Sequence, residues 1–294
     1  MKGRNRGGQT RERRENRDHR EHREPRRDEG RPRKPPVTAS LYGVLPVLEA
    51  LRSGGRRIEK IIVADGARQH RLNEIYELAR EHRVIIETVP KERLERLVEP
   101  GVNHQGVIAI AAAADYVDVD EIIDSANDPP IFVILDGVED PRNLGAILRT
   151  VECAGADGVF IPERRAVGLT ETVAKSSAGA IEHVKVAKVT NLNRFIEDLK
   201  ERNVWVVGTS GDATMSFTEW DWTTPSALVL GAEGSGLHRL VAENCDALVK
   251  IPMYGKIDSL NVSVAAGVIL FEARRQREAG SKLQVPGSMS EPHP

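Results

Sequence analysis

The chain has 294 residues, a hydrophobic content of 40% and a formal net charge of −2 at pH 7, and its length is enough for two domains with cores of their own. No window approaches 18 uninterrupted apolar residues and the N-terminus has no apolar h-region. We therefore expect no transmembrane helix, no secretory signal and a cytoplasmic location. Cys153 and Cys245 stand far apart in sequence and form no disulfide or metal-ligand pattern. We expect both to be buried or half-buried free thiols in a reducing compartment.

The first 36 residues form an arginine-rich segment. They contain 14 Lys and Arg against 7 Asp and Glu, a net charge of +7, so the rest of the chain carries −9. Because no hydrophobic residue follows Met1, we expect a disordered tail over residues 1–40. The composition fits a polyanion partner, most simply RNA, but it also fits a solubilising extension, and its mixed charges can form a transient helix with ion pairs.

Residues 41–114 alternate between helical and extended patterns and predict a small α/β domain. Helices are expected at 44–51, 72–79 and 90–98, and strands at 58–63, 84–89 and 107–112. His104 and Gln105 are the polar residues of interest before the last strand, and a turn bonded to its own backbone is the simplest role for them. The acidic residues 115–130 predict a linker with a short helix.

Residues 131–162 begin a second domain, which we expect to span 131–279. The apolar run 131–135 predicts a buried strand, and a polar loop follows at 136–143. Apolar residues at helical spacing and then Gly155 and a short strand complete a βαβ-type unit. The carboxyl ends of parallel strands, where such loops lie, are the usual ligand-binding edge of α/β proteins.

The remaining chain continues to alternate strands and helices, which predicts a mainly parallel sheet. Strands are expected at 184–189, 204–207, 227–230 and 248–251, and helices at 170–177, 192–201, 237–241 and 260–277. The first half of the last helix is apolar on nearly every side, so we expect it to pack against its own sheet and a partner subunit. Its polar second half should leave the core, and 280–294 should be a disordered tail.

Three further glycine-rich or polar loops follow apolar strands, at 208–211, 231–236 and 252–261. With the 136–143 loop they should share one edge of the sheet and form a small-molecule pocket. The sequence contains neither a P-loop nor a dinucleotide-binding GxGxxG after a strand.

Several polar residues stand at this predicted edge. Glu233 lies between glycines just before a helix, where a helix N-terminus can stabilise its carboxylate. Arg149 lies in a run that is apolar on most sides, so we expect it to have a partner. Ser259, Asn261 and Ser263 surround the start of the last helix, where capping is their simplest role.

Three segments carry a resemblance to a known family. DPRNLGAILRT (140–150), LVLGAEGSGL (228–237) and IPMYGKIDSLNVSVAAGVILFEA (251–273) resemble the three motifs of the SpoU (TrmH-type) RNA ribose 2′-O-methyltransferases of the SPOUT class. LYGVLPVLEAL and NHQG, within 41–112, resemble the substrate-binding domain that precedes the catalytic domain in many members. The resemblance covers about 41–277 and is greatest to the branch that methylates a guanosine of large-subunit ribosomal RNA.

The resemblance implies S-adenosylmethionine as methyl donor, no metal, a C-terminal trefoil knot in the mainly parallel sheet, and a homodimer with its site across the interface. RNA is the implied partner, and neither a membrane nor DNA is expected. The implied cofactor-binding residues are Gly231, Ile251 and Leu260, with Thr209 and Met253 close by. The implied catalytic and RNA-contacting residues are Asn143, Arg149, Glu233, Ser259 and Asn261.

The family's assignment of the substrate proton to Arg149 conflicts with the chemistry of guanidinium, which essentially never deprotonates in proteins. We expect Arg149 to stabilise the developing alkoxide or to hold the adjacent phosphate, and an RNA phosphate or water to take the proton. A transfer RNA ribose methyltransferase, a non-catalytic RNA-binding assembly protein on the same fold and a nucleotide-dependent oxidoreductase are the alternatives. The intact polar residues disfavour the second, and the absent dinucleotide fingerprint disfavours the third.

Overall fold

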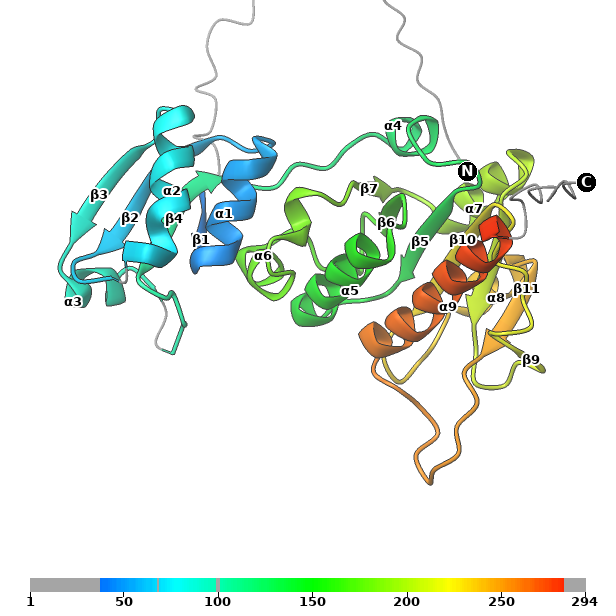
Figure 1. Cartoon of the computed structure of the whole chain (residues 1–294). Helices are drawn as coiled ribbons and strands as arrows, with labels where there is room; N and C mark the ends of the chain where they lie inside the picture. Colours follow the sequence, from blue (N-terminus) through cyan, green and yellow to red (C-terminus); the bar gives the residue numbers. More distant parts are fainter. Residues whose placement is uncertain (1–37, 68, 99–100, 283–294) are drawn as a thin grey trace, which may run out of the picture. The chain divides into compact units, whose positions relative to one another are not determined.

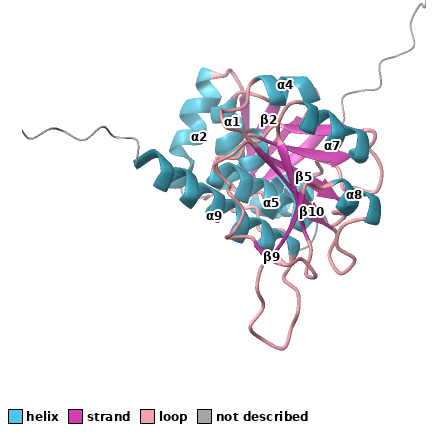
Figure 2. Ribbon diagram, turned by 90° about the vertical axis from the view of Figure 1, so that its right-hand side faces the viewer, coloured by secondary structure: helices cyan, strands magenta, loops and turns pink. Residues whose placement is uncertain are grey.

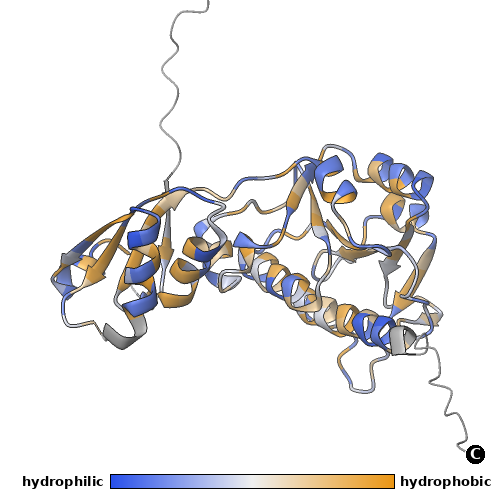
Figure 3. Cartoon of the chain, turned by 45° about the horizontal axis from the view of Figure 1, so that its top comes forward, coloured by the Kyte–Doolittle hydropathy of each residue, from blue (hydrophilic) through white to orange (hydrophobic). Residues whose placement is uncertain are grey.

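The computed structural model describes residues 38–67, 69–98 and 101–282 (Figure 1). The tails expected to be disordered, 1–40 and 280–294, lie outside these ranges except at their inner ends: residues 38–40 belong to the first strand and residues 280–282 continue the last helix, so the prediction is wrong for both of these short stretches. Within the described ranges, no helix combines the length and the apolar character that a membrane crossing requires. Strands of both sheets are coloured mostly hydrophobic in Figure 3, in agreement with their buried positions.

The first sheet has four strands in the order β1-β4-β2-β3. The strands are β1 (Thr38–Tyr42), β2 (Ile58–Ala64), β3 (Ile85–Val89) and β4 (Val107–Ala112), and the helices are α1 (Val44–Ser53), α2 (Gln69–Glu81) and α3 (Lys91–Glu95). β4 pairs antiparallel with β1 and β2, whereas β2 and β3 are parallel. Strand β1 was not predicted, because it is a short edge strand without an alternating pattern and forms through pairing with β4.

The turn before β4 contains the two polar residues of interest. Nδ1 of His104 accepts a hydrogen bond from the backbone N–H of Gly106 (3.1 Å), so the prediction of a turn bonded to its own backbone is confirmed for His104. Gln105 differs. Its Oε1 accepts from the backbone N–H of Val44 (3.0 Å), which satisfies an open donor in the first turn of α1.

The second sheet has seven strands in the order β7-β6-β5-β10-β8-β11-β9, and every pairing is parallel. The strands are β5 (Ile131–Asp136), β6 (Gly158–Pro162), β7 (Val186–Val189), β8 (Trp205–Thr209), β9 (Met215–Ser216), β10 (Ser226–Gly231) and β11 (Ala247–Lys250). The helices are α4 (Val119–Asp124), α5 (Pro141–Ala154), α6 (Glu171–Ser176), η1 (Ala180–Glu182), α7 (Leu192–Glu201), α8 (Arg239–Asn244) and α9 (Val262–Lys282). The predicted parallel sheet is therefore confirmed. The two-residue strand β9 and the single turn η1 were not predicted, because both are too short for a periodic pattern.

Helices cover both faces of this sheet. In Figure 2 its strands β5 and β10 lie between α5 and α9 on one side and α7 and α8 on the other. Val133 and Leu135 of β5 pack in one core with α5 and α9, whereas Phe132 and Ile134 pack in a second core with α7 and α8. The continuous apolar run at 131–135 is thereby explained, because a parallel strand is buried on both faces. Burial of each such side chain contributes about 1.5–3 kcal/mol.

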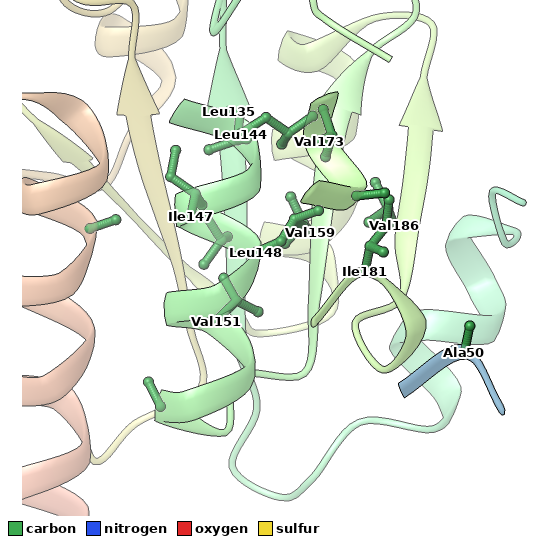
Figure 4. Packing of buried hydrophobic residues seen from close by; sticks show 14 of the residues in the cluster. Ala50, Leu135, Leu144, Ile147, Leu148, Val151, Val159, Val173, Ile181 and Val186 are labelled. Carbon is green, nitrogen blue, oxygen red and sulfur yellow. The ribbon is translucent and has the colours of Figure 1, made fainter. Parts of the chain in front are cut away.

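Helix α5 is specified at both ends by its sequence. Oδ1 of Asp140 accepts from the backbone N–H of Arg142 (2.8 Å), Pro141 occupies the first turn, and Gly155 ends the helix with φ 66°. The apolar side chains of α5 point at the sheet and at α6 in Figure 4. They are Leu144, Ile147, Leu148 and Val151.

The second half of helix α9 departs from the prediction in part: Arg274, Arg275 and Glu278 are exposed as expected, but one side of the helix still packs on the core. Ala273 is buried, and Nε and Nη2 of Arg277 donate to the carbonyls of Trp222 (2.8 Å), Pro130 (2.9 Å) and Thr224 (3.1 Å). Nη1 donates to Pro129 as well. A guanidinium carries enough donors to bind several carbonyls at once, and those near the amino ends of β5 and β10 hold Arg277 against the sheet. Burial lowers the pKa of Arg277 from its usual range.

The first half of α9 is buried on one side only, whereas we expected it to be buried on nearly every side. Ala266, Ile269 and Leu270 are buried against α5 and the sheet. Three apolar side chains nevertheless form an exposed stripe on the other side of the helix. They are Val264 (50% exposed), Val268 and Phe271 (52% exposed).

The cysteines also depart in part from the prediction. Cys153 is exposed on α5, because it lies on the side of the helix turned away from the sheet. Cys245 is half-buried, and burial raises the pKa of its thiol to about 12.

Candidate active site

A cavity of about 910 Å³ lies at the carboxyl edge of the second sheet. The loops after β8, β10 and β11 line it, so the prediction that these three loops share one edge is confirmed. Val262, Ala265 and Ile269 of α9 form an apolar wall. In Figure 1 the loop between β11 and α9 projects from the body of the sheet beside this edge.

The loop after β10 turns back on itself at once. Ala232 and Gly236 exchange two backbone hydrogen bonds of 3.0 and 2.9 Å, and Gly236 has φ 67°, a conformation that suits glycine. At Gly231 a Cβ would lie 2.1 Å from the carbonyl carbon of Gly236, so no other residue fits there. The GAEGSG sequence therefore builds a tight backbone turn at the wall of the cavity.

A chain of side-chain hydrogen bonds borders the cavity. Nδ2 of Asn143 donates to Oε2 of Glu233 (3.0 Å), and Nδ2 of Asn261 donates to Oδ1 of Asn143 (2.9 Å). Oδ1 of Asn261 in turn accepts from the backbone N–H of Ser263 (2.9 Å) and from its hydroxyl (2.6 Å). Each bond fixes the orientation of the next amide, so Asn143, which is buried, can present only its donor to Glu233. The predicted capping role of Asn261 is confirmed within the same network.

The structure brings most of the sequence-predicted residues to this place. Seven of them line the cavity: Thr209, Gly231, Glu233, Ile251, Met253, Ser259 and Leu260. Asn143 and Asn261 adjoin it through their hydrogen bonds to Glu233 and to each other. Oγ1 of Thr209 donates to the carbonyl of Val229 (3.2 Å) within the sheet, which leaves the cavity wall at that point apolar.

Arg149 is not at the cavity of its own chain. It lies six residues after Asn143, and at about 100° per residue this turns its side chain to a different face of α5. The side chain of Arg149 is exposed and forms no hydrogen bond or ion pair with any described residue, so the described part of its own chain does not provide the expected partner. The reason is that the apolar residues around it in sequence belong to the opposite, sheet-facing side of the helix.

Sequence reasoning missed the pair formed by Asp136 and His238. Asp136 ends β5, opposite Gly231 of β10, and is only 4% exposed. Its carboxylate accepts from the backbone N–H of His238 (2.7 Å) and lies 2.8 Å from Nδ1 of the ring. The pair ties the turn after β10 to the end of β5. An aspartate that ends an apolar strand just before a glycine was the available signal.

No three His, Cys, Asp or Glu side chains in the described part of the chain are placed to hold a metal ion together. What the edge offers instead is a roomy cavity with backbone groups on its rim and an oriented amide–carboxylate network at one side. This arrangement suits an organic ligand and a polar reaction beside it.

The comparisons with known proteins agree with this geometry. Residues 130–271 match the SpoU rRNA Methylase family, and residues 40–117 match the family described as RNA 2′-O ribose methyltransferase substrate binding. Over 240 residues the chain is 48% identical to YacO of Bacillus subtilis, which is assigned by name to the TrmH family of tRNA/rRNA methyltransferases. That match covers 81% of this chain and 95% of YacO. The chain belongs to the SpoU (TrmH) family of RNA methyltransferases.

Solved structures of SpoU enzymes share the fold. AviRb from Streptomyces viridochromogenes has a TM-score of 0.70 at 26% identity over 83% of this chain and 91% of its own. The AdoMet-bound rRNA methyltransferase from Sinorhizobium meliloti has a TM-score of 0.68 at 26% identity over 81% of this chain and 87% of its own. This SpoU protein is therefore an enzyme of the RNA methyltransferase class, with the mixed α/β architecture that the resemblance implied.

Proposed function

We propose that this SpoU protein transfers a methyl group from S-adenosylmethionine to the ribose 2′-hydroxyl of a guanosine in large-subunit ribosomal RNA. The observation that carries the proposal is the hydrogen-bonded chain from Ser263 through Asn261 and Asn143 to Glu233 at the rim of the cavity. The presence of a separate region that matches the RNA substrate-binding family, and a structural neighbour named as an rRNA methyltransferase, support ribosomal RNA over transfer RNA.

The residues of the cavity fit the methyl donor. Leu230, Ile251 and Leu260 offer apolar surface for an adenine ring, and the loops after β10 and β11 bring backbone to the rim of the cavity around it. Asp212 and Ser210, on the loop after β8, are available for hydroxyl and ammonium groups. When bound, S-adenosylmethionine supplies a methyl group on a positively charged sulfur, which a nucleophile can attack directly.

The chain's own residues must then align the ribose and manage its proton. Glu233, which Asn143 holds in place, offers an acceptor at the rim that can hold the ribose hydroxyls in line with the methyl group; such positioning supplies much of the catalysis. Ser259 lies on the cavity wall and can contact the nucleotide. Arg149 would stabilise the developing alkoxide or hold the neighbouring phosphate, and an RNA phosphate or water would take the proton.

We also propose that the protein acts as a homodimer whose active site needs Arg149 from the second copy. The exposed stripe of α9 is apolar, and the loop after β11 also exposes Tyr254 (96% exposed) and Ile257. Exposed apolar surface of this kind marks an interaction site. A partner seated there would supply what one chain lacks, because Arg149 and Asn143 lie on different faces of α5.

The test is methyl transfer from labelled S-adenosylmethionine to purified large-subunit rRNA and to bulk tRNA, both without prior modification, with the labelled nucleoside identified. Label in 2′-O-methylguanosine of rRNA alone is the expected result. Label in tRNA alone would support the proposed methyl-transfer reaction but contradict ribosomal RNA as its substrate. Absence of label from both RNAs, together with absence of cofactor binding by calorimetry, would favour a non-enzymatic RNA-binding role.

A further inference from the structure

The ten arginines between residues 131 and 282 form two groups that differ in their contacts. Five bind carboxylates or carbonyls of the chain: Arg202, Arg239, Arg274, Arg275 and Arg277. The other five are exposed and form no ion pair or side-chain hydrogen bond with a described residue: Arg142, Arg149, Arg164, Arg165 and Arg194. Arg194 belongs to α7, on the other face of the sheet, and Arg149 already has a proposed role. No role has yet been given to Arg142 or to the adjacent pair Arg164 and Arg165.

Arg164 and Arg165 lie in the loop 163–169, which follows β6 at the same edge of the sheet as the cavity. β6 is the direct neighbour of β5, and the backbone N–H of Val167 donates to the carbonyl of Val138 (3.2 Å). The hydroxyl of Ser176 on α6 also donates to the carbonyl of Pro141, at 3.1 Å. Two hydrogen bonds therefore join this region to the loop that leads into Asn143.

Both ends of the loop are held in place. At its start the backbone N–H of Glu163 donates to the carbonyl of Val189 (3.0 Å), and at its end the N–H of Leu169 donates to the hydroxyl of Tyr116 (3.0 Å). Arg165 has φ 58°, an uncommon backbone conformation for a residue other than glycine. A mobile loop of solvated arginines would need none of these restraints. The loop instead holds the backbone of both arginines in a defined place beside the Asn143 loop.

The carboxylates in this region do not neutralise the pair. Asp140 is used to cap α5, and Glu139 and Glu163 are exposed and form no ion pair with a described arginine. The surface is consequently mixed in charge rather than broadly basic. Recognition here would rest on the planar guanidinium fork, which matches the geometry of a phosphate group.

We propose that Arg164 and Arg165, held beside the Asn143 loop, bind phosphate groups of the RNA strand next to the target nucleotide. The inference rests on the proposed function, because it assigns the RNA path across that site. It adds an RNA-binding element inside the catalytic region, distinct from the region at 40–117 that matches the substrate-binding family.

The test is equilibrium binding of the full-length protein to in vitro transcribed large-subunit rRNA at several salt concentrations. The variants are Arg164→Ala, Arg165→Asn and the double variant, and asparagine is chosen at 165 because it accepts the left-handed conformation. Arg202→Ala is the control, since Arg202 is also exposed but lies at the far end of α7 and pairs with Asp120. Cofactor affinity and thermal midpoint are measured for every variant to confirm folding.

For the double variant we expect at least a tenfold loss of RNA affinity at moderate salt and a fall of about 2 in the slope of log K against log salt. Arg202→Ala should bind like the wild type. Unchanged affinity and slope in the folded double variant would overturn the inference. If the wild type binds rRNA and the variants do not, but no methyl is transferred, the proposed function fails and the phosphate-binding role stands.

Discussion

At the scale of single residues, Asn143 has the most constrained position at the site. Its amide is buried, and both ends of it are committed, one to Glu233 and one to Asn261. The direction of every hydrogen bond follows from Asn261, whose oxygen is fixed by the first turn of α9. Asn143 therefore couples the position of α9 to that of the Glu233 carboxylate at the rim of the cavity.

Asn143→Ala should therefore lower kcat for methyl transfer about 10²- to 10³-fold, the range seen when one preorganised polar group is removed from an active site. The thermal midpoint should change by only a few degrees. Asn244→Ala is the matched control, because Nδ2 of Asn244 donates to Oδ1 of Asn193 (2.9 Å) in a similar amide pair away from the cavity. Equal loss of activity in both variants would show that the network matters only for folding.

The two thiols should differ in reactivity. Burial raises the pKa of Cys245 to about 12, so at pH 8 only about one part in ten thousand is thiolate. Burial and the neighbouring Glu152 also raise the pKa of Cys153, but this residue is exposed. Under native conditions iodoacetamide should label Cys153 slowly and leave Cys245 unlabelled, as read by peptide mass spectrometry, and urea should expose both. Rapid native labelling of Cys245 would contradict its placement.

At the scale of elements, α9 is held at its C-terminal half by Arg277. Arg277→Met keeps much of the apolar stem but leaves the carbonyl of Trp222 without its donor and removes one of the donors to the carbonyls of Pro130 and Thr224, which Ser226 also contacts. We expect a loss of about 2–4 kcal/mol in the free energy of unfolding, measured by urea denaturation. Arg274→Met, which removes an exposed pair with Glu278, should cost under about 1 kcal/mol. Equal losses in the two variants would show that the contacts of Arg277 with the carbonyls contribute little to the free energy of unfolding.

The elements also show what the sequence could predict. Periodicity located nearly every helix and strand of useful length, because each buries a face of its own. It missed β1 and β9, whose existence depends on pairing with a distant strand. It misjudged Arg277 and Arg149 for a related reason: a side chain's partners are set by where the helix lies, and local pattern carries no information about that. The residues that line the cavity were predicted through motifs, whereas the pairing of Asp136 with His238 depends on strand order.

At the scale of the whole molecule, the role proposed for Arg149 requires a second copy of the chain, because Arg149 does not line the cavity of its own chain. The proposed contact surface is the apolar stripe of α9. Introducing Asp at Val268 and Phe271 together should prevent dimer formation, because each charge would be buried against an apolar partner surface. We expect a monomer by sedimentation and loss of methyl transfer with retained cofactor binding. A fully active monomer would contradict the shared site.

Complementation gives the sharper test of the same arrangement. Arg149→Ala and Asn143→Ala should each be nearly inactive as homodimers. If every site combines Asn143 of one copy with Arg149 of the other, a heterodimer of the two variants contains one site with both residues intact and one with neither. After co-expression or subunit exchange, random pairing makes about half of the dimers heterodimers, so activity should return to about a quarter of the wild-type value. If both residues acted within one chain, no pairing would restore a site, and the mixture would stay inactive.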